Sequence, residues 1–558
     1  MFENNLKELQ KINPDLCDRL KKLHNESLDE SISVGQAESG EFILLKGDFP
    51  LDDLKSPSKA SQNIISRTIL SELRKSDFIL IYGLGMGYLL DEVFLKYDSK
   101  IIIYEPDINV LRFVFENVDL VKYLSDNRVF IFNDEKECLK YISGHFISGD
   151  KMEITYPANY ALFYQQVMPE FIQQIYNILK RNIIDTNTTK KLSELWTKNI
   201  IMNSRKANNK ILFSQLENKF KGTTAMILGA GPSLKENIKK IKENREKFTI
   251  FAVNRTLEYL QQENIVPDFA VFTDSTIVKS TTEKLENDYI KQLNIIADIK
   301  ASSFIFDFDC KNLIVYLPNN EPLIGLIAEK QNLKLQETYG TAAAVCLYCA
   351  KEIGAKEIIC AGIDLAFKGD ELYSDGKGKC DGNQVTVDNY SVRMTEVKSK
   401  DGEMVKTRED YLSFIPQFEK VIEGLNKKVK VYNITSFGAY IKGMEYKTLE
   451  EIIPEKSACD TDKILASITP QVVDYATTID EEWVKSENIA DEINKKKEYV
   501  NLGDLIKNVM ESKLLYATCQ YEILELGKKG FTFENVTDFK NFMNDLCDRL
   551  RKVYYELD

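Results

Sequence analysis

Short runs of apolar residues alternate with longer polar or amphipathic stretches through most of the second half of the chain. Seven such runs stand out, at residues 225–228, 249–253, 269–272, 294–297, 312–316, 357–361 and 430–432. Short runs that are apolar throughout are typical of strands buried on both faces, and the stretches between them are long enough for crossover helices. The pattern predicts an α/β domain with a parallel sheet that begins near Thr224.

The same alternation occurs nearer the N-terminus. Apolar runs at 77–82, 100–104 and 129–132 predict three strands, and residues 88–96 predict a helix after the first of them. The first run leads into Gly83-Leu-Gly-Met-Gly87, and the second ends at Glu105. In dinucleotide- and S-adenosylmethionine-binding folds such glycines approach the ligand and the acid binds ribose hydroxyls. GxGxG alone does not separate a working methyltransferase from a Rossmann-like domain kept as a scaffold, so both interpretations stay open.

The remaining segments favour helices. Residues 1–45 predict a helix followed by short strands, residues 165–220 predict long helices, and residues 450–558 show helical periodicity, as in Leu502, Leu505, Ile506 and Val509.

Residues 368–412 form a polar insertion with a hairpin signal around Asp401-Gly402, which is typical of a lid. The prediction is therefore α/β: two Rossmann-like parallel-sheet domains followed by a C-terminal helical bundle. The expected domains are 1–45, 46–195, 196–448 and 449–558.

The segment Gly229-Ala-Gly-Pro-Ser-Leu234 links the strand predicted at 225–228 to a Lys-rich helix predicted at 235–247. Glycines let a ligand approach the backbone, Pro232 suits the first turn of a helix, and free N–H groups at that end attract anions. The turn predicts a site for a nucleotide or sugar phosphate.

Polar residues follow several of the predicted strands, namely Asn254, Thr273, Asp274 and Asp364. Because ligands bind at the carboxyl ends of strands in open α/β sheets, we expect these residues to converge with Gly229, Gly231 and Ser233. Trp196, Asn199 and Asn203 share one helix face by their spacing. The two asparagines either bind neighbouring backbone or reach a ligand.

Charge and composition narrow the class of protein. A net charge of −13 argues against nucleic acid as a partner. The chain has no run of about 18 apolar residues that would predict a membrane span, and its N-terminus lacks a signal-peptide pattern, so we expect a cytoplasmic protein with reduced cysteines.

Cys346 and Cys349 form a CxxC without a second pair, which fits a buried helix better than a zinc site. Both histidines, His24 and His145, precede residue 229, so chemistry in the second half must proceed without histidine.

Residues 224–445 resemble a domain shared by the motility-associated factor (Maf) flagellin glycosyltransferases and the archaeal hydroxymethylpterin diphosphokinases. The same order of motifs is similar to bacterial sialyltransferases that use CMP-sialic acid. The motifs are Gly229-Ala-Gly-Pro-Ser-Leu234, Phe251-Ala-Val-Asn254, Gly340-Thr-Ala-Ala-Ala344, Ile353-Gly-Ala-Lys-Glu-Ile358, Gly362-Ile-Asp364-Leu-Ala and Asn433-Ile-Thr-Ser-Phe-Gly-Ala-Tyr-Ile-Lys-Gly443. The Rossmann-like unit before them and the helical tail after them resemble Maf proteins specifically.

The resemblance implies a cytoplasmic glycosyltransferase that moves a nonulosonic acid (pseudaminic, legionaminic or Kdo-like) from a CMP-activated donor to Ser or Thr hydroxyls of flagellin, for flagellum assembly and motility. The donor-binding residues that it and the strand-end pattern suggest are Gly229, Gly231, Pro232, Ser233, Asn254, Thr273, Gly340, Thr341, Asn199 and Asn203. The implied catalytic residues are Asp364, at the cytidine ribose or ordering the site, and Tyr373, at the leaving phosphate. The transfer requires no metal, although a divalent ion is compatible with it.

Two features depart from the family pattern. The lid has no histidine to act as base, and Phe367 stands near a tyrosine of related proteins. The candidate bases are then Asp274 first, with Asp364, Asp381 and Asp388 as alternatives. Two other functions stay open: a hydroxymethylpterin-type diphosphokinase, with ATP–Mg²⁺ held by carboxylates such as Asp274, Asp307 or Asp309, and a non-catalytic flagellin-binding protein.

Overall fold

The structure is a computed structural model that describes residues 1–26, 29–67, 76–146, 149–277, 279, 282–369, 373, 379–381, 384–387, 390–425, 429–495, 507, 509–529 and 533–555. The chain divides into two compact units, Met1–Thr189 and Lys190–Asp558. Each unit is built around its own parallel β-sheet.

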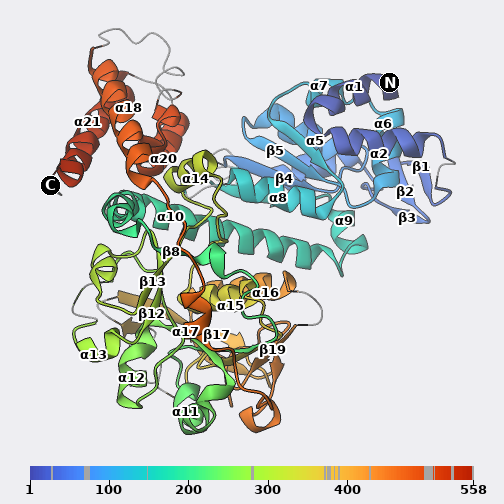
Figure 1. Cartoon of the computed structure of the whole chain (residues 1–558). Coiled ribbons are helices and arrows are strands. Elements are labelled where there is room, and N and C mark those ends of the chain that lie inside the picture. The colour runs from blue at the N-terminus through green and yellow to red at the C-terminus, as the bar shows by residue number, and fades with distance from the viewer. Residues whose placement is uncertain are drawn as a thin grey trace. The chain divides into compact units, whose positions relative to one another are not determined.

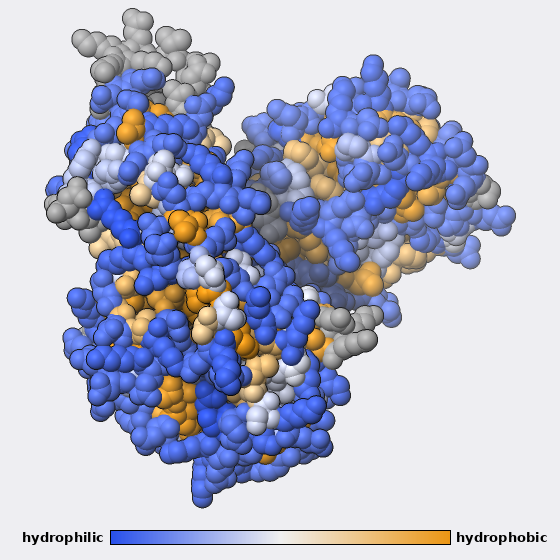
Figure 2. Space-filling model, in the orientation of Figure 1, coloured by the Kyte–Doolittle hydropathy of each residue, from blue (hydrophilic) through white to orange (hydrophobic). Residues whose placement is uncertain are grey.

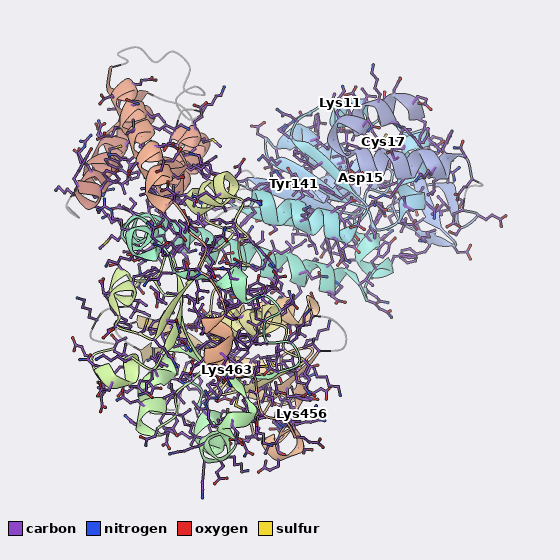
Figure 3. All side chains as sticks on the ribbon, in the orientation of Figure 1. Lys11, Asp15, Cys17, Tyr141, Lys456 and Lys463 are labelled. Carbon is purple, nitrogen blue, oxygen red and sulfur yellow. The ribbon has the colours of Figure 1, made fainter. Side chains whose placement is uncertain are left out.

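The N-terminal unit contains a four-stranded parallel sheet in the order β6-β5-β4-β7 (Figure 1). Its strands are β4 (Phe78–Tyr82), β5 (Lys100–Tyr104), β6 (Val129–Phe132) and β7 (Met152–Thr155). The helices around it are α3 (Pro57–Arg67), α5 (Tyr88–Lys96), α6 (Ile108–Asn117), α7 (Val121–Leu124), α8 (Glu135–His145) and α9 (Ala158–Phe163). A small antiparallel sheet of β1 (Ile32–Gln36), β2 (Phe42–Lys46) and β3 (Phe49–Pro50) precedes them. Cys17 and Tyr141, labelled in Figure 3, belong to this unit, and Cys17 is fully buried.

Two helices, not one, open the chain. α1 (Phe2–Ile12) ends at Asn13, and α2 (Pro14–His24) begins immediately after it. Asn13 caps α2 by accepting a hydrogen bond from the backbone N–H of Leu16, and Pro14 occupies the first position of the helix. Because Asn and Pro are strong signals for a helix start, this break corrects the single helix expected from periodicity.

The C-terminal unit contains a nine-stranded, all-parallel sheet in the order β20-β19-β14-β9-β10-β11-β12-β13-β8. The strands are β8 (Ile211–Leu212), β9 (Thr224–Leu228), β10 (Thr249–Val253), β11 (Phe269–Phe272), β12 (Asn294–Asp298), β13 (Asn312–Tyr316), β14 (Glu357–Ala361), β19 (Lys430–Asn433) and β20 (Glu445–Tyr446). From β9 the chain steps outward through β10, β11, β12 and β13, and then returns to place β14 on the other side of β9. The switch point of the sheet, where ligands bind in such folds, therefore lies between β9 and β14.

Both faces of this sheet are buried. Alternate residues of β9 belong to different hydrophobic clusters: Met226 and Leu228 to one, Ala225 and Ile227 to the other. Helix α15 (Ala342–Glu352) packs on the second face, against β9, β10 and β11. Cys346 and Cys349 lie on this helix and are fully buried, which confirms their expected role as small core residues.

The other helical elements of the unit are α11 (Ser233–Glu243), η2 (Arg245–Lys247), η3 (Asn254–Thr256), α12 (Leu257–Gln262), α13 (Asn287–Ile290), η5 (Ser303–Asp307), α14 (Pro322–Gln331), α16 (Glu409–Glu423), η6 (Leu449–Glu451) and α17 (Thr461–Ala466), together with η1 (Phe213–Leu216). The expected lid contains an antiparallel sheet of β15 (Lys379–Asp381), β16 (Gln384–Val387), β17 (Tyr390–Lys398) and β18 (Met404–Arg408). The hairpin expected around Asp401-Gly402 is formed by β17 and β18.

Long helices complete the fold. α10 (Met168–Ala207) is a single helix of 40 residues, and α18 (Tyr475–Lys495), α20 (Lys513–Lys529) and α21 (Phe533–Tyr555) pack against one another near the C-terminus (Figure 1). Leu502, Leu505 and Ile506, which contributed to the expected periodicity, lie outside the described residues, whereas Val509 is buried. The expected α/β class with two parallel sheets is confirmed.

The surface seen in Figure 2 is largely hydrophilic, with smaller hydrophobic areas between the charged side chains. In the part of the chain that the structure describes, no helix combines the length and the apolar character needed to cross a bilayer.

Candidate functional site

The glycine turn lies at the carboxyl edge of the sheet, at the switch point between β9 and β14. The N–H of Gly229 donates to the carbonyl of Ala361 (2.8 Å), and the N–H of Gly231 donates to the carbonyl of Gly362 (2.9 Å). A Cβ on Gly229 would lie 2.4 Å from the carbonyl oxygen of Gly362. The loops after β9 and β14 therefore pack directly backbone against backbone, which requires glycine at this contact.

Asp364 joins these two loops. Its Oδ2 accepts the backbone N–H of Ser233 at 2.8 Å, and its Oδ1 accepts the hydroxyl of Ser233. The Ser233 hydroxyl in turn accepts the N–H of Gly362 (3.2 Å). The amides of Gly231 and Ser233 are thus used within the protein, which corrects the expectation that they point freely at a phosphate. Of the two roles expected for Asp364, the contacts support ordering of the site.

A third segment packs on the same loop. The N–H of Ala439 donates to the carbonyl of Asp364 (2.8 Å), and the side-chain amide of Asn433 donates to the carbonyl of Ile363 (3.0 Å). Gly438 has a φ of +124°, and a Cβ there would lie 2.7 Å from the carbonyl oxygen of Asp364. Three of the motifs identified in the sequence, around Gly229, Gly362 and Asn433, are therefore parts of one packed structure.

The other strand-end residues lie along the same edge. Asn254 and Thr273 follow β10 and β11 and are partly exposed. Asp274 is exposed, and its Oδ1 accepts the N–H and the hydroxyl of Thr276, both at 2.7 Å. Gly340 and Thr341 precede α15, and the N–H of Gly340 donates to the side chain of Gln417. Because β14, β9, β10 and β11 are neighbours in the sheet, the expected convergence on one edge is found.

Asn199 and Asn203 bind backbone of their own chain. The Asn199 amide donates to the carbonyl of Lys300 (2.9 Å), and the Asn203 amide donates to the carbonyls of Ile299 and Ala301, both at 2.8 Å. Both asparagines are buried. Their amide groups hold the turn after β12, which is the first of the two roles considered for them, and their contact with a ligand stays a prediction.

The described part of the lid brings cations to Tyr373. The Tyr373 hydroxyl accepts from Arg408 (3.1 Å), and the guanidinium carbon of Arg255 lies 4.1 Å from the centre of the Tyr373 ring. Arg408 is buried and also pairs with Asp410, while burial raises the pKa of Tyr411 beside it. The sequence interpretation missed both arginines, although Arg255 directly follows Asn254. The side chains of two other candidates, Asp381 and Asp388, lie outside the described part of the structure.

A second buried polar cluster follows β12 and β13. It contains Asp298, Lys300 and Glu321, each with an exposed fraction of 5–6%. Burial raises the pKa of Asp298 and raises that of Glu321 to about 7. The sequence interpretation missed Lys300 and Glu321, although Asp298-Ile-Lys300 is a polar segment directly after a predicted strand.

Comparisons with known proteins agree with this geometry. Residues 198–370 match the family model described as 6-hydroxymethylpterin diphosphokinase MptE-like. A solved Maf glycosyltransferase from Magnetospirillum magneticum AMB-1 superposes with a TM-score of 0.62 and 14% sequence identity, covering 99% of this chain and 90% of that one. This chain shares the fold of that protein. An uncharacterized protein of Treponema pallidum is also 28% identical over 147 residues, which are 26% of this chain and 68% of the relative. The expected resemblance, a Maf architecture with an MptE-like central region, is confirmed.

In the N-terminal unit, side chains of the protein itself bind the backbone of the GxGxG loop. The N–H of Leu84 donates to Glu105 (2.8 Å), that of Gly85 to the Tyr160 hydroxyl (2.9 Å) and that of Met86 to Asp52 (3.3 Å). A Cβ on Gly83 would lie 2.2 Å from the Tyr160 ring. The glycines thus make room for side chains of the protein. Glu105, which in dinucleotide-binding folds would bind ribose hydroxyls, accepts the N–H of Leu84 in the glycine loop. These contacts favour the scaffold interpretation of this unit.

Buried carboxyl groups predict the pH dependence of stability. Burial raises the pKa of Glu105 from 4.5 to about 7, and burial raises the pKa of Asp52 and Asp364 to about 6. A raised pKa in the folded state means that stability is greatest where the carboxyl group is protonated and falls as the pH rises through 6 to 7. We expect the N-terminal unit to lose about 2 kcal/mol between pH 5.5 and pH 8, a shift of several degrees in its thermal midpoint.

Calorimetry of the full chain across this pH range measures the effect. Glu105→Gln is the matched variant, because a neutral side chain removes the largest titrating group and should flatten the profile of the N-terminal transition. A wild-type midpoint that rises from pH 5.5 to pH 8 would contradict the assignment.

Proposed function

We propose that this chain is a glycosyltransferase, and that it moves a nonulosonic acid of the pseudaminic, legionaminic or Kdo-like kind from a CMP-activated donor to Ser or Thr hydroxyls of flagellin. The observation that carries the proposal is the whole-chain match to the fold of a Maf glycosyltransferase. The polar edge of the central sheet, at its switch point, supports it as the place of the donor.

Transfer of the sugar acid requires the enzyme mainly to position the two substrates and to stabilise the leaving group. A sugar acid linked through its tertiary anomeric carbon to a phosphate leaves an oxocarbenium-like centre when CMP departs, so the enzyme must orient the acceptor and stabilise the leaving anion. Tyr373, which receives a hydrogen bond from Arg408, is the candidate for the second task. No metal is assigned a step in this reaction.

Asp274 is the candidate base. It is exposed at the end of β11, whereas Asp364 is buried and already holds Ser233. An exposed carboxylate at the ligand-binding edge can approach an acceptor hydroxyl, and general-base assistance of this kind contributes about 100-fold or more.

Co-expression with flagellin and a defined nonulosonate pathway, followed by intact-mass spectrometry, tests the proposal. Wild type should add the mass of the sugar acid to flagellin, and Asp274→Asn should slow this modification about 100-fold while leaving the fold unchanged. Asp309→Asn is the control, because Asp309 is an exposed aspartate at the opposite, amino end of β13. Unmodified flagellin despite an abundant donor would contradict the proposal. Flagellin that binds without being modified would favour the non-catalytic alternative.

A diphosphokinase remains the second candidate, because the family model that matches residues 198–370 carries that description. Of the carboxylates considered for Mg²⁺, Asp307 pairs with Lys206 and Asp309 lies near Lys291, so Asp274 is the one at the carboxyl edge. Among the described residues, no group of three or more His, Cys, Asp or Glu is arranged to hold a metal ion. Thermal stabilisation by ATP–Mg²⁺ but not by CMP would favour this function over transfer of a sugar acid.

A further inference from the structure

Lys300 is a buried lysine at the ligand-binding edge of the sheet. It follows β12, is 5% exposed, and its ammonium lies 4.8 Å from the centre of the Trp196 ring. The one hydrogen bond of its ammonium among the described residues is to the Oδ1 of Asn320 (3.1 Å). An ammonium group has three donors, so this lysine retains capacity for a further acceptor.

Several side chains hold the turn that carries Lys300 through hydrogen bonds. Asn199 and Asn203 on α10 bind the carbonyls of residues 299, 300 and 301, and the Ser302 hydroxyl contacts the carbonyls of Ser275 and Ile277. The Trp196 ring is fixed as well, because its N–H donates to the Ser275 hydroxyl (3.0 Å). Functional groups held by a supporting shell of hydrogen bonds are the arrangement expected of a binding site.

Lys300 lies among buried acidic groups but has no direct carboxylate partner among the described residues. Asp298 and Glu321 act on it electrostatically, while its ammonium contacts the Asn320 oxygen and the Trp196 ring. The Oε1 atom of Glu321 is buried and has no hydrogen-bond partner in the described part of the chain. A ligand carboxylate would supply the direct, charged acceptor that the Lys300 ammonium lacks.

Access is compatible with a ligand. Asn320, which accepts from Lys300, is an exposed residue, and Trp196 is partly exposed. A ligand carboxylate could take the place of the Asn320 oxygen as the acceptor for the Lys300 ammonium. The hydrogen bond of the ammonium would then have a charged acceptor in place of a neutral one, which makes such a bond roughly twice as strong.

We propose that Lys300 binds the carboxylate of the donor's sugar acid, with Trp196 forming an apolar wall of the same subsite. This inference rests on the proposed function, since it assigns the sugar half of the donor to the end of β12. The nucleotide half is then bound elsewhere along the edge. The subsite explains how a neutral sugar would be distinguished from a sugar acid, because only the acid supplies a charge for the lysine.

Isothermal titration of the full chain with CMP and with CMP-N-acetylneuraminate tests the assignment. Lys300→Gln should weaken binding of the CMP-sugar acid about 10- to 100-fold and change the binding of CMP less than about twofold, because CMP has no carboxylate. Lys300→Arg, which keeps the charge, should retain part of the affinity. Lys311→Gln is the matched control, since it removes the same charge at the amino end of β13 and should leave both affinities unchanged.

Each other outcome is informative. Equal losses for CMP and the CMP-sugar acid in Lys300→Gln, or no loss for either, would overturn the subsite and leave Lys300 as a counter-charge to Asp298 and Glu321. If Lys300→Gln does not fold, unchanged affinities in Lys300→Arg and in Trp196→Ala would overturn it. Wild type that binds neither probe would instead reject the proposed CMP donor, and the subsite with it.

Discussion

Replacing Gly229 by alanine is expected to destabilise the C-terminal unit by about 3 kcal/mol. The added methyl group would lie 2.4 Å from the carbonyl oxygen of Gly362 and 2.4 Å from the Cδ1 of Ile363. The side chain of Ile363 can move, but the carbonyl of Gly362 cannot, since it accepts the N–H of Gly231 (2.9 Å). The packing is equally tight from the other side, because a Cβ on Gly362 would lie 2.3 Å from the carbonyl oxygen of Gly229. Relief would require β9 and β14 to separate at the centre of the nine-stranded sheet.

Gly325→Ala provides the control for this substitution. Gly325 lies within α14, and an added Cβ there meets nothing within 4 Å. Alanine at a helical position is expected to stabilise the unit by about 1 kcal/mol relative to glycine. Urea unfolding of the two variants and wild type, followed by tryptophan fluorescence, measures both effects. A Gly229→Ala variant as stable as wild type would show that the contact between the two loops is looser than described.

The strands of the central sheet were predictable because the chain buries both of their faces. β10, β11, β13 and β14 each contain an unbroken run of apolar residues, which marks their positions in the sequence. β8 and β20 each span two residues, which is too short for such a signal. β8 also pairs with β13, which lies far away in the sequence. The break between α1 and α2 was not predicted, although Asn13 and Pro14 encode it as the cap and first residue of α2.

The candidate site was predictable in position but not in detail. Strand-end placement predicted that Asp274 and Asp364 lie at the carboxyl edge of the sheet, where the structure has them, since parallel strands end together. That Asp364 would occupy the amide of Ser233, 131 residues earlier, depends on side-chain directions that no local pattern contains. The asparagines of α10 illustrate the same limit: their spacing identified a shared face, while the backbone that this face contacts comes from the turns after β11 and β12.

The GxGxG loop shows how a motif can be satisfied without a ligand. Its spacing predicts backbone that something approaches closely, and in the structure the approaching groups are the Tyr160 ring and the Asp52 carboxylate. Sequence alone cannot separate these occupants from a nucleotide, because both require the same absence of a side chain on the loop.

Tyr160→Ala is expected to unfold the N-terminal unit, at a cost of about 4 kcal/mol for the ring alone. The fully buried ring packs on Gly83, and its hydroxyl both accepts the N–H of Gly85 and donates to Glu105 (2.6 Å). Tyr160→Phe keeps the ring but leaves the Glu105 carboxyl and the Gly85 amide without this partner, so a loss of about 2 kcal/mol is expected. Because Glu105 is fully buried, the missing bond is not readily replaced by water.

Differential scanning calorimetry with limited proteolysis measures the two substitutions on the full chain. Cleavage is expected to begin within residues 1–189 in Tyr160→Ala, while the CMP binding proposed for the C-terminal unit persists. Tyr156→Ala is the control, because Tyr156 is 36% exposed just beyond β7 and should change the midpoint little. If Tyr160→Ala retained the wild-type midpoint, the ring would not fill the glycine loop, and the loop would again be open to a nucleotide; that result would reverse the interpretation of this unit as a scaffold.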